Sequence, residues 1–363
     1  MSGVEQRRGR VHHGREPYLW PARDPAQLGI DPTRVEAVAS FARAHEAESL
    51  LVLREGELIL ERYWGRQGGD LQQTYSGTKS LFSLLVLRLI ANGALAGLDQ
   101  PIRDLIPERE DPQGQLTFRS IMAMQSGLEN SPQIESLGET GLTQLEIGLQ
   151  TPIVAPPFTT YYYNNAGYRL LFTALERATG MDLEALTETQ LFEPLGFGSA
   201  HWQRLYWFDG NIERFQGYQS ICMAPRDFAK SAQVIVDDGL WHGERFVDEG
   251  LCRELVKAPS PGDNPSFGLF HHLNAGSWFR AYVEPKRLER KLAPGCPDDL
   301  FLQYGAGGQM VAGSKSLRLV VARTGRDDGS SIYPRENHFI HLLAMISSLV
   351  SSAEGTAFAA GAE

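Results

Sequence analysis

The amino-acid sequence predicts an α+β fold, in which an antiparallel sheet built from both ends of the chain is flanked by helices and holds an inserted, mostly helical lobe. Three observations predict this class. Strand-like patterns occupy residues 50–64, helical patterns follow from about residue 79 to residue 232, and strand-like patterns return in the C-terminal part of the chain. Strands and helices are therefore segregated along the chain, which is typical of α+β rather than of α/β proteins.

The first two strands are expected to form a hairpin. Residues 50–64, LLVLREGELILERYW, alternate apolar and polar side chains around the turn Glu55-Gly56-Glu57, and this pattern predicts a β-hairpin. A helix is then predicted from near Ser76 to Asn92-Gly93, because Asn-Gly is a typical helix stop. The same kinds of pattern place later helices at residues 118–124, 166–179, 225–237 and 337–350, and later strands at residues 301–303, 309–312 and 317–323.

The chain is expected to have two parts of unequal size. Residues 1–45 are interpreted as a flexible N-terminal arm and a first helix, and residues 46–363 as a single domain whose helical lobe covers about residues 80–235. The N-terminus lacks the apolar core of a signal peptide. The longest apolar stretch, residues 81–91, is too short to span a bilayer. These features predict a cytoplasmic location.

Composition excludes several classes of function. The chain has 363 residues, 42% of them hydrophobic, so it can bury a large core, and its formal net charge is −10. Because an acidic chain offers no electrostatic footprint for nucleic acid or anionic lipid, neither is expected as a partner. The three cysteines form no CxxC pair, and the sequence contains no HExxH, P-loop or GxSxG motif. No metal and no cofactor are therefore expected.

The strongest chemical signal is the S-x-x-K sequence Ser76-Gly77-Thr78-Lys79 at the start of a predicted helix. A spacing of three residues puts the serine hydroxyl and the lysine amine on one helix face. The free N–H groups of the helix N-terminus favour a developing oxyanion, and burial lowers the pKa of a lysine, which makes it a credible base. The alternative is structural, with Ser76 as a helix N-cap and Lys79 as a solvated first-turn residue. Two details favour chemistry, because a lysine here opposes the helix dipole and the chain has only six lysines.

Two further segments carry weaker signals. Residues 161–168, YYYNNAGY, offer a phenol that could relay protons and an amide that could orient a substrate. The alternative, which this segment taken alone favours, is a packed aromatic corner with Asn164 or Asn165 as a helix cap. Residues 303–309, QYGAGGQ, place glycines at a strand edge, where a ligand can approach the backbone closely. A tight bend or bulge is the alternative interpretation of this segment.

Taken in this order, the three segments resemble the serine β-lactamase-related family of penicillin-recognising hydrolases, especially its class C-like esterase and 6-aminohexanoate-oligomer hydrolase branches. Residues 76–80 are similar to the S-x-T-K-S nucleophile motif of that family. Further similar blocks, in the family's order, are found at residues 98–108, 116–128 and 225–229. The resemblance covers about residues 50–350 and implies a β-lactamase/transpeptidase-like fold, with residues 46–363 as the catalytic domain.

The resemblance also implies roles for individual residues. The family's Y-x-N motif fits best at Tyr163 and Asn165, because this register also puts Gly167 and Tyr168 at their family positions. The third family motif, K-T-G or H-T-G, aligns with Gln303-Tyr304-Gly305, which lacks the cation that helps bind the carboxylate of a β-lactam. By the same alignment, the backbone N–H groups of Ser76 and Ala306 would hold the oxyanion, and Gly305 would lie beside the substrate.

These assignments predict a serine hydrolase that cleaves an ester or amide bond of a small molecule through an acyl-enzyme on Ser76. Lys79 and Tyr163 would move the protons, and Asn165 would orient the substrate and the lysine. A carboxylesterase or linear-amide hydrolase is favoured. The alternatives are a β-lactamase or D-amino-acid peptidase and, from another class, a non-catalytic binding protein on the same scaffold.

An aromatic, uncharged pocket rim is expected, which favours uncharged acyl substrates. The residues expected to line this pocket are Tyr161, Tyr162, Trp202, Trp207 and Phe208.

Overall fold

The computed structural model describes residues 2–111, 114–281, 286–326, 332–333 and 337–360, with residues 352–360 described only as helical backbone. Its main sheet is antiparallel, in the strand order β10-β13-β14-β15-β3-β4. An early strand, β3 (Ala47–Arg54), pairs with the late strand β15 (Leu319–Gly325), so the sheet is built from both ends of the chain and the predicted α+β class is confirmed. The other strands of this sheet are β4 (Glu57–Tyr63), β10 (His272–Leu273), β13 (Phe301–Gly305) and β14 (Gln309–Ser314).

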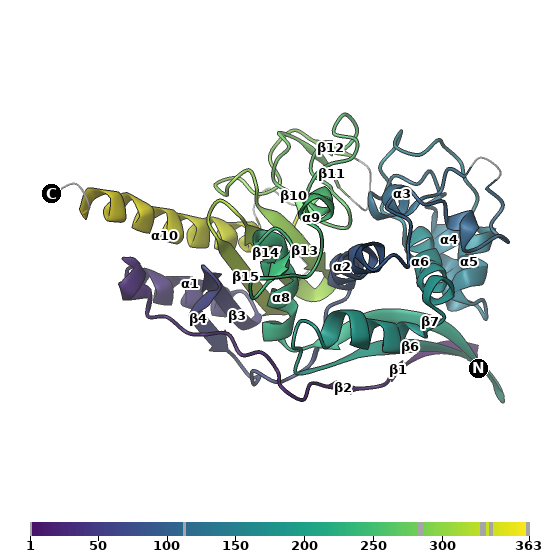
Figure 1. Ribbon diagram of the computed structural model, residues 1–363, viewed down its shortest axis with the longest axis horizontal. Helices are drawn as coiled ribbons and strands as arrows, with labels where there is room; N and C mark the ends of the chain where they lie inside the picture. The colour runs from purple at the N-terminus through teal and green to yellow at the C-terminus, as the bar shows by residue number, and fades with distance from the viewer. Residues whose placement is uncertain (1, 112–113, 282–285, 327–331, 334–336, 361–363) are drawn as a thin grey trace.

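Helices cover both faces of this sheet (Figure 1). Successive side chains of a strand point to opposite faces, and β3 follows this rule: Leu50 and Val52 pack toward α1 (Pro32–Ala44) and α10 (His338–Ala360), whereas Leu51 and Leu53 belong to the core on the other side. On that second side, α8 (Pro225–Val236) packs against β14 and β15. The strands β13, β14 and β15 are thus buried on both faces.

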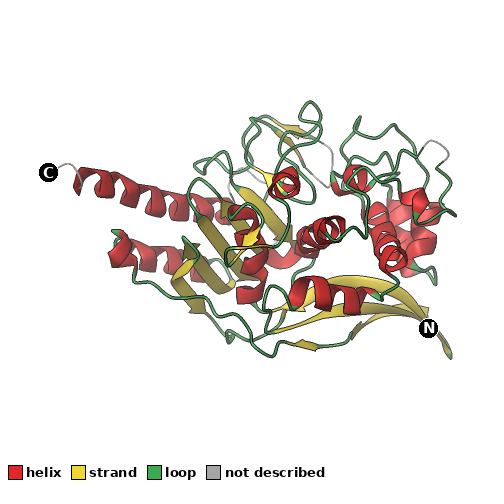
Figure 2. Cartoon of the chain, viewed as in Figure 1, coloured by secondary structure: helices red, strands yellow, loops and turns green. Residues whose placement is uncertain are grey.

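The helical lobe lies beside the sheet, with α2 (Gly77–Ala91) running between the two parts (Figures 1 and 2). Most of α2 is buried, which explains why its sequence is apolar all round rather than on one stripe. The lobe and its connections contain α3 (Phe118–Met122), α4 (Pro132–Ser136), α5 (Gln144–Gln150), α6 (Asn165–Thr179), α7 (Leu183–Thr187) and α9 (Glu249–Leu255), with short helical turns at 25–28, 102–104, 137–139, 188–192 and 306–308.

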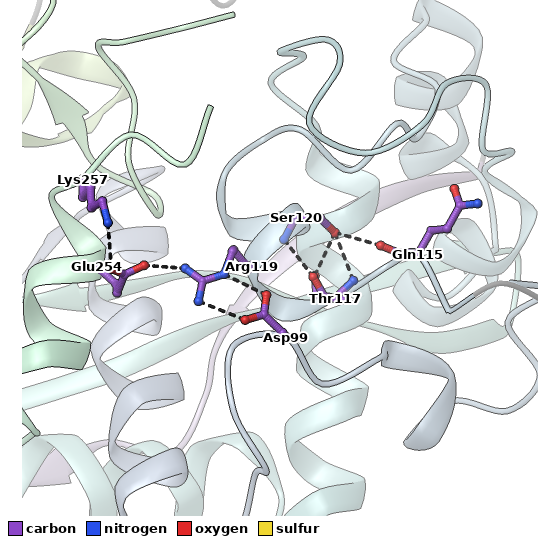
Figure 3. Close-up of polar contacts among 7 residues, drawn as sticks. All are labelled: Asp99, Gln115, Thr117, Arg119, Ser120, Glu254 and Lys257. Atoms are coloured by element: carbon purple, nitrogen blue, oxygen red, sulfur yellow. Dashed lines mark hydrogen bonds and ion pairs between the residues drawn. The ribbon is translucent and has the colours of Figure 1, made fainter. Parts of the chain in front are cut away.

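The block at residues 116–128 owes its pattern to local structure (Figure 3). Thr117 caps α3, because its hydroxyl accepts from the Ser120 N–H while the Ser120 hydroxyl accepts from the Thr117 N–H. Arg119 then donates to Asp99 at 2.8 Å and to Glu254 of α9 at 2.6 Å. These contacts connect the start of α3 to the segment at Asp99 and to α9.

Two expectations about where strands occur in the chain are wrong. The N-terminal residues, expected as a flexible arm, form the strand β1 (Ser2–Arg8), which pairs with β6 (Ser199–Asp209). The zone expected to be mostly helical contains the long hairpin of β6 and β7 (Ile212–Met223), whose sheet has the order β1-β6-β7-β5, with β2 (His12–His13) also on β6. The signal that was missed is the Asp209-Gly210 turn between two aromatic-rich runs, where Gly210 adopts a φ of +58°.

Three short paired segments complete the fold: β5 (Gln72–Gln73) on β7, β8 (Leu240–Trp241) with β9 (Glu244–Arg245), and β11 (Phe279–Arg280) with β12 (Arg287–Leu288). Within the described part of the chain, every helix is too short or too polar to cross a membrane.

Candidate active site

Ser76 stands in a turn that the surrounding structure holds firmly. The preceding β5 pairs with β7, and Thr74 Oγ1 donates to the Ile221 carbonyl oxygen at 2.9 Å and contacts Thr78 Oγ1 at 2.8 Å. Tyr75 has a φ of +46°, a conformation that costs free energy for a residue other than glycine and that concentrates at functional sites. The strained residue Tyr75 directly precedes Ser76, which supports a functional site at this turn.

The contacts of Ser76 and Lys79 exclude the structural explanation of the S-x-x-K sequence. Among the described residues, the Ser76 side chain makes no capping hydrogen bond to α2, and Lys79 is only 6% exposed. Instead, Lys79 Nζ donates to Ser76 Oγ at 3.3 Å. The two side chains therefore face each other, as their spacing on the helix predicts.

Burial favours the neutral amine form of Lys79. The low-dielectric surroundings and, to a smaller extent, the positive charge of Arg169 lower the pKa of Lys79 to about 7, while the Glu135 carboxylate acts in the opposite direction. A lysine with this pKa is partly neutral at neutral pH, so it can accept a proton from a neighbouring hydroxyl.

Tyr163 completes the group around the serine. Burial raises the pKa of Tyr163 to about 12, and a hydrogen bond with Ser76 opposes that rise. Its ring centroid lies 5.1 Å from Lys79 Nζ, and that of Tyr168 lies 4.7 Å from the same atom. Because the Tyr163 phenol keeps its proton at neutral pH, it can donate a hydrogen bond and relay a proton while Lys79 supplies the basic lone pair.

The two neighbouring asparagines have different surroundings. Asn164 is buried and caps α6: its Oδ1 accepts from the Gly167 N–H at 2.7 Å, and its Nδ2 donates to the Leu128 and Glu129 carbonyl oxygens. Asn165 instead lines the cavity at Ser76, and its Nδ2 donates to Glu135 at 3.3 Å. The helix cap and the site asparagine are thus adjacent but separate residues.

Gly305 and Ala306 bring β13 against the nucleophile turn. A Cβ at Gly305 would collide with the carbonyl oxygen of Thr74, so only glycine allows the strand to approach this closely. Ala306 follows as a lining residue of the cavity.

Gln303 takes the place of the lysine or histidine of the third family motif, and its side chain points into the protein. There Ser231 Oγ donates to Gln303 Oε1 at 2.6 Å, and the Gln303 amide nitrogen lies 3.3 Å from His271 Nε2.

Ser76, Lys79, Asn165 and Ala306 line a cavity of about 220 Å³, whereas Tyr163 and Gly305 are not among its lining residues. It is lined by Tyr75, Ser76, Lys79, Gln144, Asn165, Tyr168, Arg169, Phe172, Leu205, Tyr218, Gln219, Ser220 and Ala306. Among the described residues, no group of three or more His, Cys, Asp and Glu side chains is placed to hold a metal ion. The arrangement supplies a hydroxyl, a neutral amine, a phenol and an amide around one small space, which is the set of groups that nucleophilic acyl transfer uses.

The predicted rim of the pocket is wrong. Of the five aromatic residues expected there, all of them described, none lines the cavity. Tyr161 and Trp202 are each 1% exposed and belong to the core, and Trp207 lies on the β6–β7 hairpin against Gly141. The predicted uncharged character is also wrong, since Arg169 is a lining residue. Arg169 lies one turn after Asn165 on α6, so both side chains reach the same cavity.

Comparison with known proteins finds similarity to one family over part of the chain. The family model described as Beta-lactamase matches residues 38–205, a range that includes Ser76, Lys79 and Tyr163. A Salmonella agona protein named "Putative D-alanyl-D-alanine carboxypeptidase" is 21% identical over 207 residues, which are 47% of this chain and 48% of that protein. The chain therefore spans about half the length of the curated relatives it matches.

Solved structures share nearly the whole fold. The "Putative 6-aminohexanoate-dimer hydrolase from Bacillus anthracis" matches with a TM-score of 0.67 and 14% identity over 97% of this chain and 91% of that one. A family VIII carboxylesterase matches with a TM-score of 0.60 and 16% identity over 87% of this chain and 97% of that one. The β-lactamase/transpeptidase-like fold is confirmed. With the family-model match, so is the resemblance to the serine β-lactamase-related family.

Proposed function

We propose that this chain, which has the fold of the serine β-lactamase-related family, is a serine hydrolase that cleaves a small ester or linear amide through an acyl-enzyme on Ser76. One observation carries the proposal: Lys79 is buried, its Nζ lies 3.3 Å from Ser76 Oγ at a cavity, and its pKa is about 7. A buried lysine without a carboxylate partner is costly for stability, so its retention beside a serine supports a chemical role.

In the first step, Ser76 Oγ attacks the carbonyl carbon of the substrate. As the new C–O bond forms, the serine proton passes to the neutral amine of Lys79, either directly or through Tyr163. The electron pair of the carbonyl moves onto its oxygen, where the backbone N–H groups of Ser76 and Ala306 would stabilise the charge. Collapse of this intermediate breaks the bond to the leaving group, which takes the proton from Lys79 or Tyr163.

In the second step, water replaces the leaving group. Water gives a proton to the same amine–phenol pair and attacks the acyl carbon, and Ser76 Oγ leaves with that proton restored. Lys79 and Tyr163 titrate as a coupled pair, but the high pKa of Tyr163 favours Lys79 as the group that accepts the proton. Asn165, at the cavity wall, would orient the substrate.

Two observations favour esters and linear amides over β-lactams. The residue at the aligned position of the missing cation, Gln303, is fully buried and bonded to Ser231 and His271, so it cannot contact a substrate. The solved relatives include proteins named as a 6-aminohexanoate-dimer hydrolase and a family VIII carboxylesterase. The names of the curated relatives keep a D-alanyl-D-alanine carboxypeptidase activity as the second candidate.

The test uses an acylating probe on the full chain. A fluorophosphonate probe should label the wild-type protein, and Ser76→Ala should lose both the labelling and the hydrolysis of p-nitrophenyl esters. Ser136→Ala, which changes an exposed serine, is the matched control and should keep both. Undiminished labelling of Ser76→Ala would contradict the assignment. A wild-type protein that takes no probe and cleaves no ester, nitrocefin or linear amide would instead indicate the non-catalytic binding protein.

A further inference from the structure

Arg169 differs from the other partly buried arginines of the helical lobe and its surroundings. Those arginines hold carboxylates or carbonyl groups: Arg119 binds Asp99 and Glu254, Arg204 binds Glu184, Arg226 binds Glu61, and Arg109 binds the carbonyl oxygens of Gly148 and Leu149. Within the residues that the structure describes, Arg169 makes no hydrogen bond and no ion pair. Its guanidinium lies against Gly138 and contributes to the wall of the Ser76 cavity.

A buried arginine without a charged partner should bind an anion favourably. A guanidinium stays charged at all ordinary pH values, and burial penalises a charge that has no partner. Burial lowers the pKa of Arg169, and the Glu135 carboxylate opposes this effect without forming an ion pair with it. A carboxylate that entered the cavity would supply the missing partner, because arginine binds carboxylates with two parallel hydrogen bonds.

The other groups of the cavity suit an anion as well. The described lining residues include no carboxylate, and the second cation of the cavity, Lys79, has a pKa of about 7. The hydroxyl of Tyr168 is buried at the same wall and has no hydrogen-bond partner among the described residues. Glu135, whose charge acts on Arg169, is exposed and already accepts a hydrogen bond from Asn165 Nδ2.

We propose that Arg169 is the anion-binding residue of the Ser76 cavity and that it selects substrates with a carboxylate close to the ester or amide bond. This inference rests on the proposed function, whose substrate class it names. The cavity of about 220 Å³ is smaller than a typical drug-binding pocket of about 300–1,000 Å³, so the carboxylate and the scissile bond must be only a few bonds apart. The cation for the substrate carboxylate thus comes from α6 rather than from β13.

The test compares substrates that differ only in charge. Monomethyl glutarate and its carboxamide, methyl glutaramate, place the group on the acyl side, while 4-acetoxybenzoate and 4-acetoxybenzamide place it on the leaving group. The wild-type enzyme should prefer the carboxylate in at least one pair by about tenfold in kcat/KM. Arg169→Met should bring that ratio close to one, and Arg169→Lys should restore part of it. The ratio cancels any effect that the substitution has on Lys79, because both substrates need the same base.

Arg253→Met, which removes a 61% exposed arginine, is the control and should keep the wild-type ratio. A direct binding measurement separates this inference from the proposed function. Glutarate should bind Ser76→Ala protein about tenfold more tightly than it binds the Ser76→Ala, Arg169→Met double variant, as measured by calorimetry. Equal binding, or a carboxylate preference that survives Arg169→Met, would overturn the role of Arg169. If the wild-type protein showed neither labelling nor turnover while glutarate binding still depended on Arg169, the proposed hydrolase function would be overturned instead.

Discussion

Two buried lysines lie in two helices of this protein, each three residues after a polar partner, and the charge of that partner differs. Lys79 follows Ser76 by three residues at the start of α2, and Lys230 follows Asp227 by three residues in the middle of α8. Both are almost inaccessible, at 6% and 0% exposed, and both lie near two aromatic rings. Lys230 Nζ donates to Asp227 Oδ1 at 2.7 Å, whereas Lys79 Nζ donates to a neutral hydroxyl at 3.3 Å.

The partner decides what each lysine can do. Burial lowers the pKa of both amines, but the negative charge of Asp227 opposes this effect at Lys230. Asp227 Oδ2 also accepts from the Gly198 N–H at 3.0 Å, so the pair connects α8 to the β6 region. Lys230 is therefore part of a structural ion pair, while Lys79 faces a cavity without a carboxylate in contact and is available as a base.

The largest expected effect is the loss of activity when Lys79 is replaced. Lys79→Met should lower kcat/KM for a p-nitrophenyl ester by about 10³-fold, because a positioned general base contributes roughly 10²–10⁴-fold. Lys79→Arg should fail as well, since a guanidinium keeps its proton. Steady-state kinetics on both variants check this, with Lys257→Met, which changes a 72% exposed lysine, as the control. Activity within tenfold of wild type in Lys79→Met would exclude Lys79 as the base.

The second largest effect concerns stability at the other lysine. Lys230→Met leaves Asp227 buried without its cation and should lower the free energy of unfolding by about 3 kcal/mol. Urea denaturation at pH 7 measures this change. The double variant Asp227→Asn, Lys230→Met should lose less, because it leaves no buried charge. If the single and double variants lost the same amount, the contribution of Lys230 would come from packing rather than from the ion pair.

The sequence predicted the contact between Ser76 and Lys79 better than the architecture around it. The S-x-x-K spacing identified Ser76 and Lys79, because a helix places residues three apart on one face whatever surrounds it. The hairpin of β6 and β7 was missed although its turn is local, and its pairing with β1, which lies almost two hundred residues away in the sequence, leaves no local pattern. Gly305 was selected as part of a motif, but its reason, the carbonyl oxygen of Thr74, appears only when β13 meets the nucleophile turn.

Arg169 illustrates the limit of such reasoning. Its neighbours Tyr163, Asn165 and Tyr168 were identified from their motif, but a single arginine on a helix carries no pattern of its own. Many described arginines face a carboxylate, a carbonyl oxygen or solvent, and nothing in the sequence shows that the Arg169 guanidinium faces a cavity. Only the tertiary structure, which places α6 beside α2, brings its charge to the cavity of Ser76.

The third prediction concerns stability at Lys79, where the same substitution should have the opposite effect from Lys230→Met. The unfolded chain holds this lysine at its ordinary pKa of 10.5, whereas the folded protein lowers its pKa to about 7. The cost of burying the amine is complete below pH 7 and disappears as the pH rises from 7 to 10.5, because the folded protein releases the proton first. Lys79→Met should therefore raise the free energy of unfolding at pH 7 by roughly 1–3 kcal/mol. The gain over wild type should shrink toward pH 10 in urea denaturation. A variant less stable than wild type at pH 7 would show that Lys79 is held by interactions stronger than its burial cost.

The smallest effects are shifts of the pH profile, and they test most directly which group is the base. With a neutral ester, kcat/KM of the wild-type enzyme should rise about tenfold per pH unit below a midpoint near 7, because only the neutral amine of Lys79 accepts the serine proton. Arg169 lowers the pKa of Lys79 and Glu135 raises it, so Arg169→Met should move the midpoint to higher pH and Glu135→Gln to lower pH. Each shift should be a few tenths of a pH unit, as expected for charges that act without direct contact. Arg253→Met should leave the midpoint in place. Since the pKa of Tyr163 is about 12, a midpoint that ignored both substitutions would point to Tyr163 or to a group outside this pair, and the contrast between the two lysines would lose its chemical meaning.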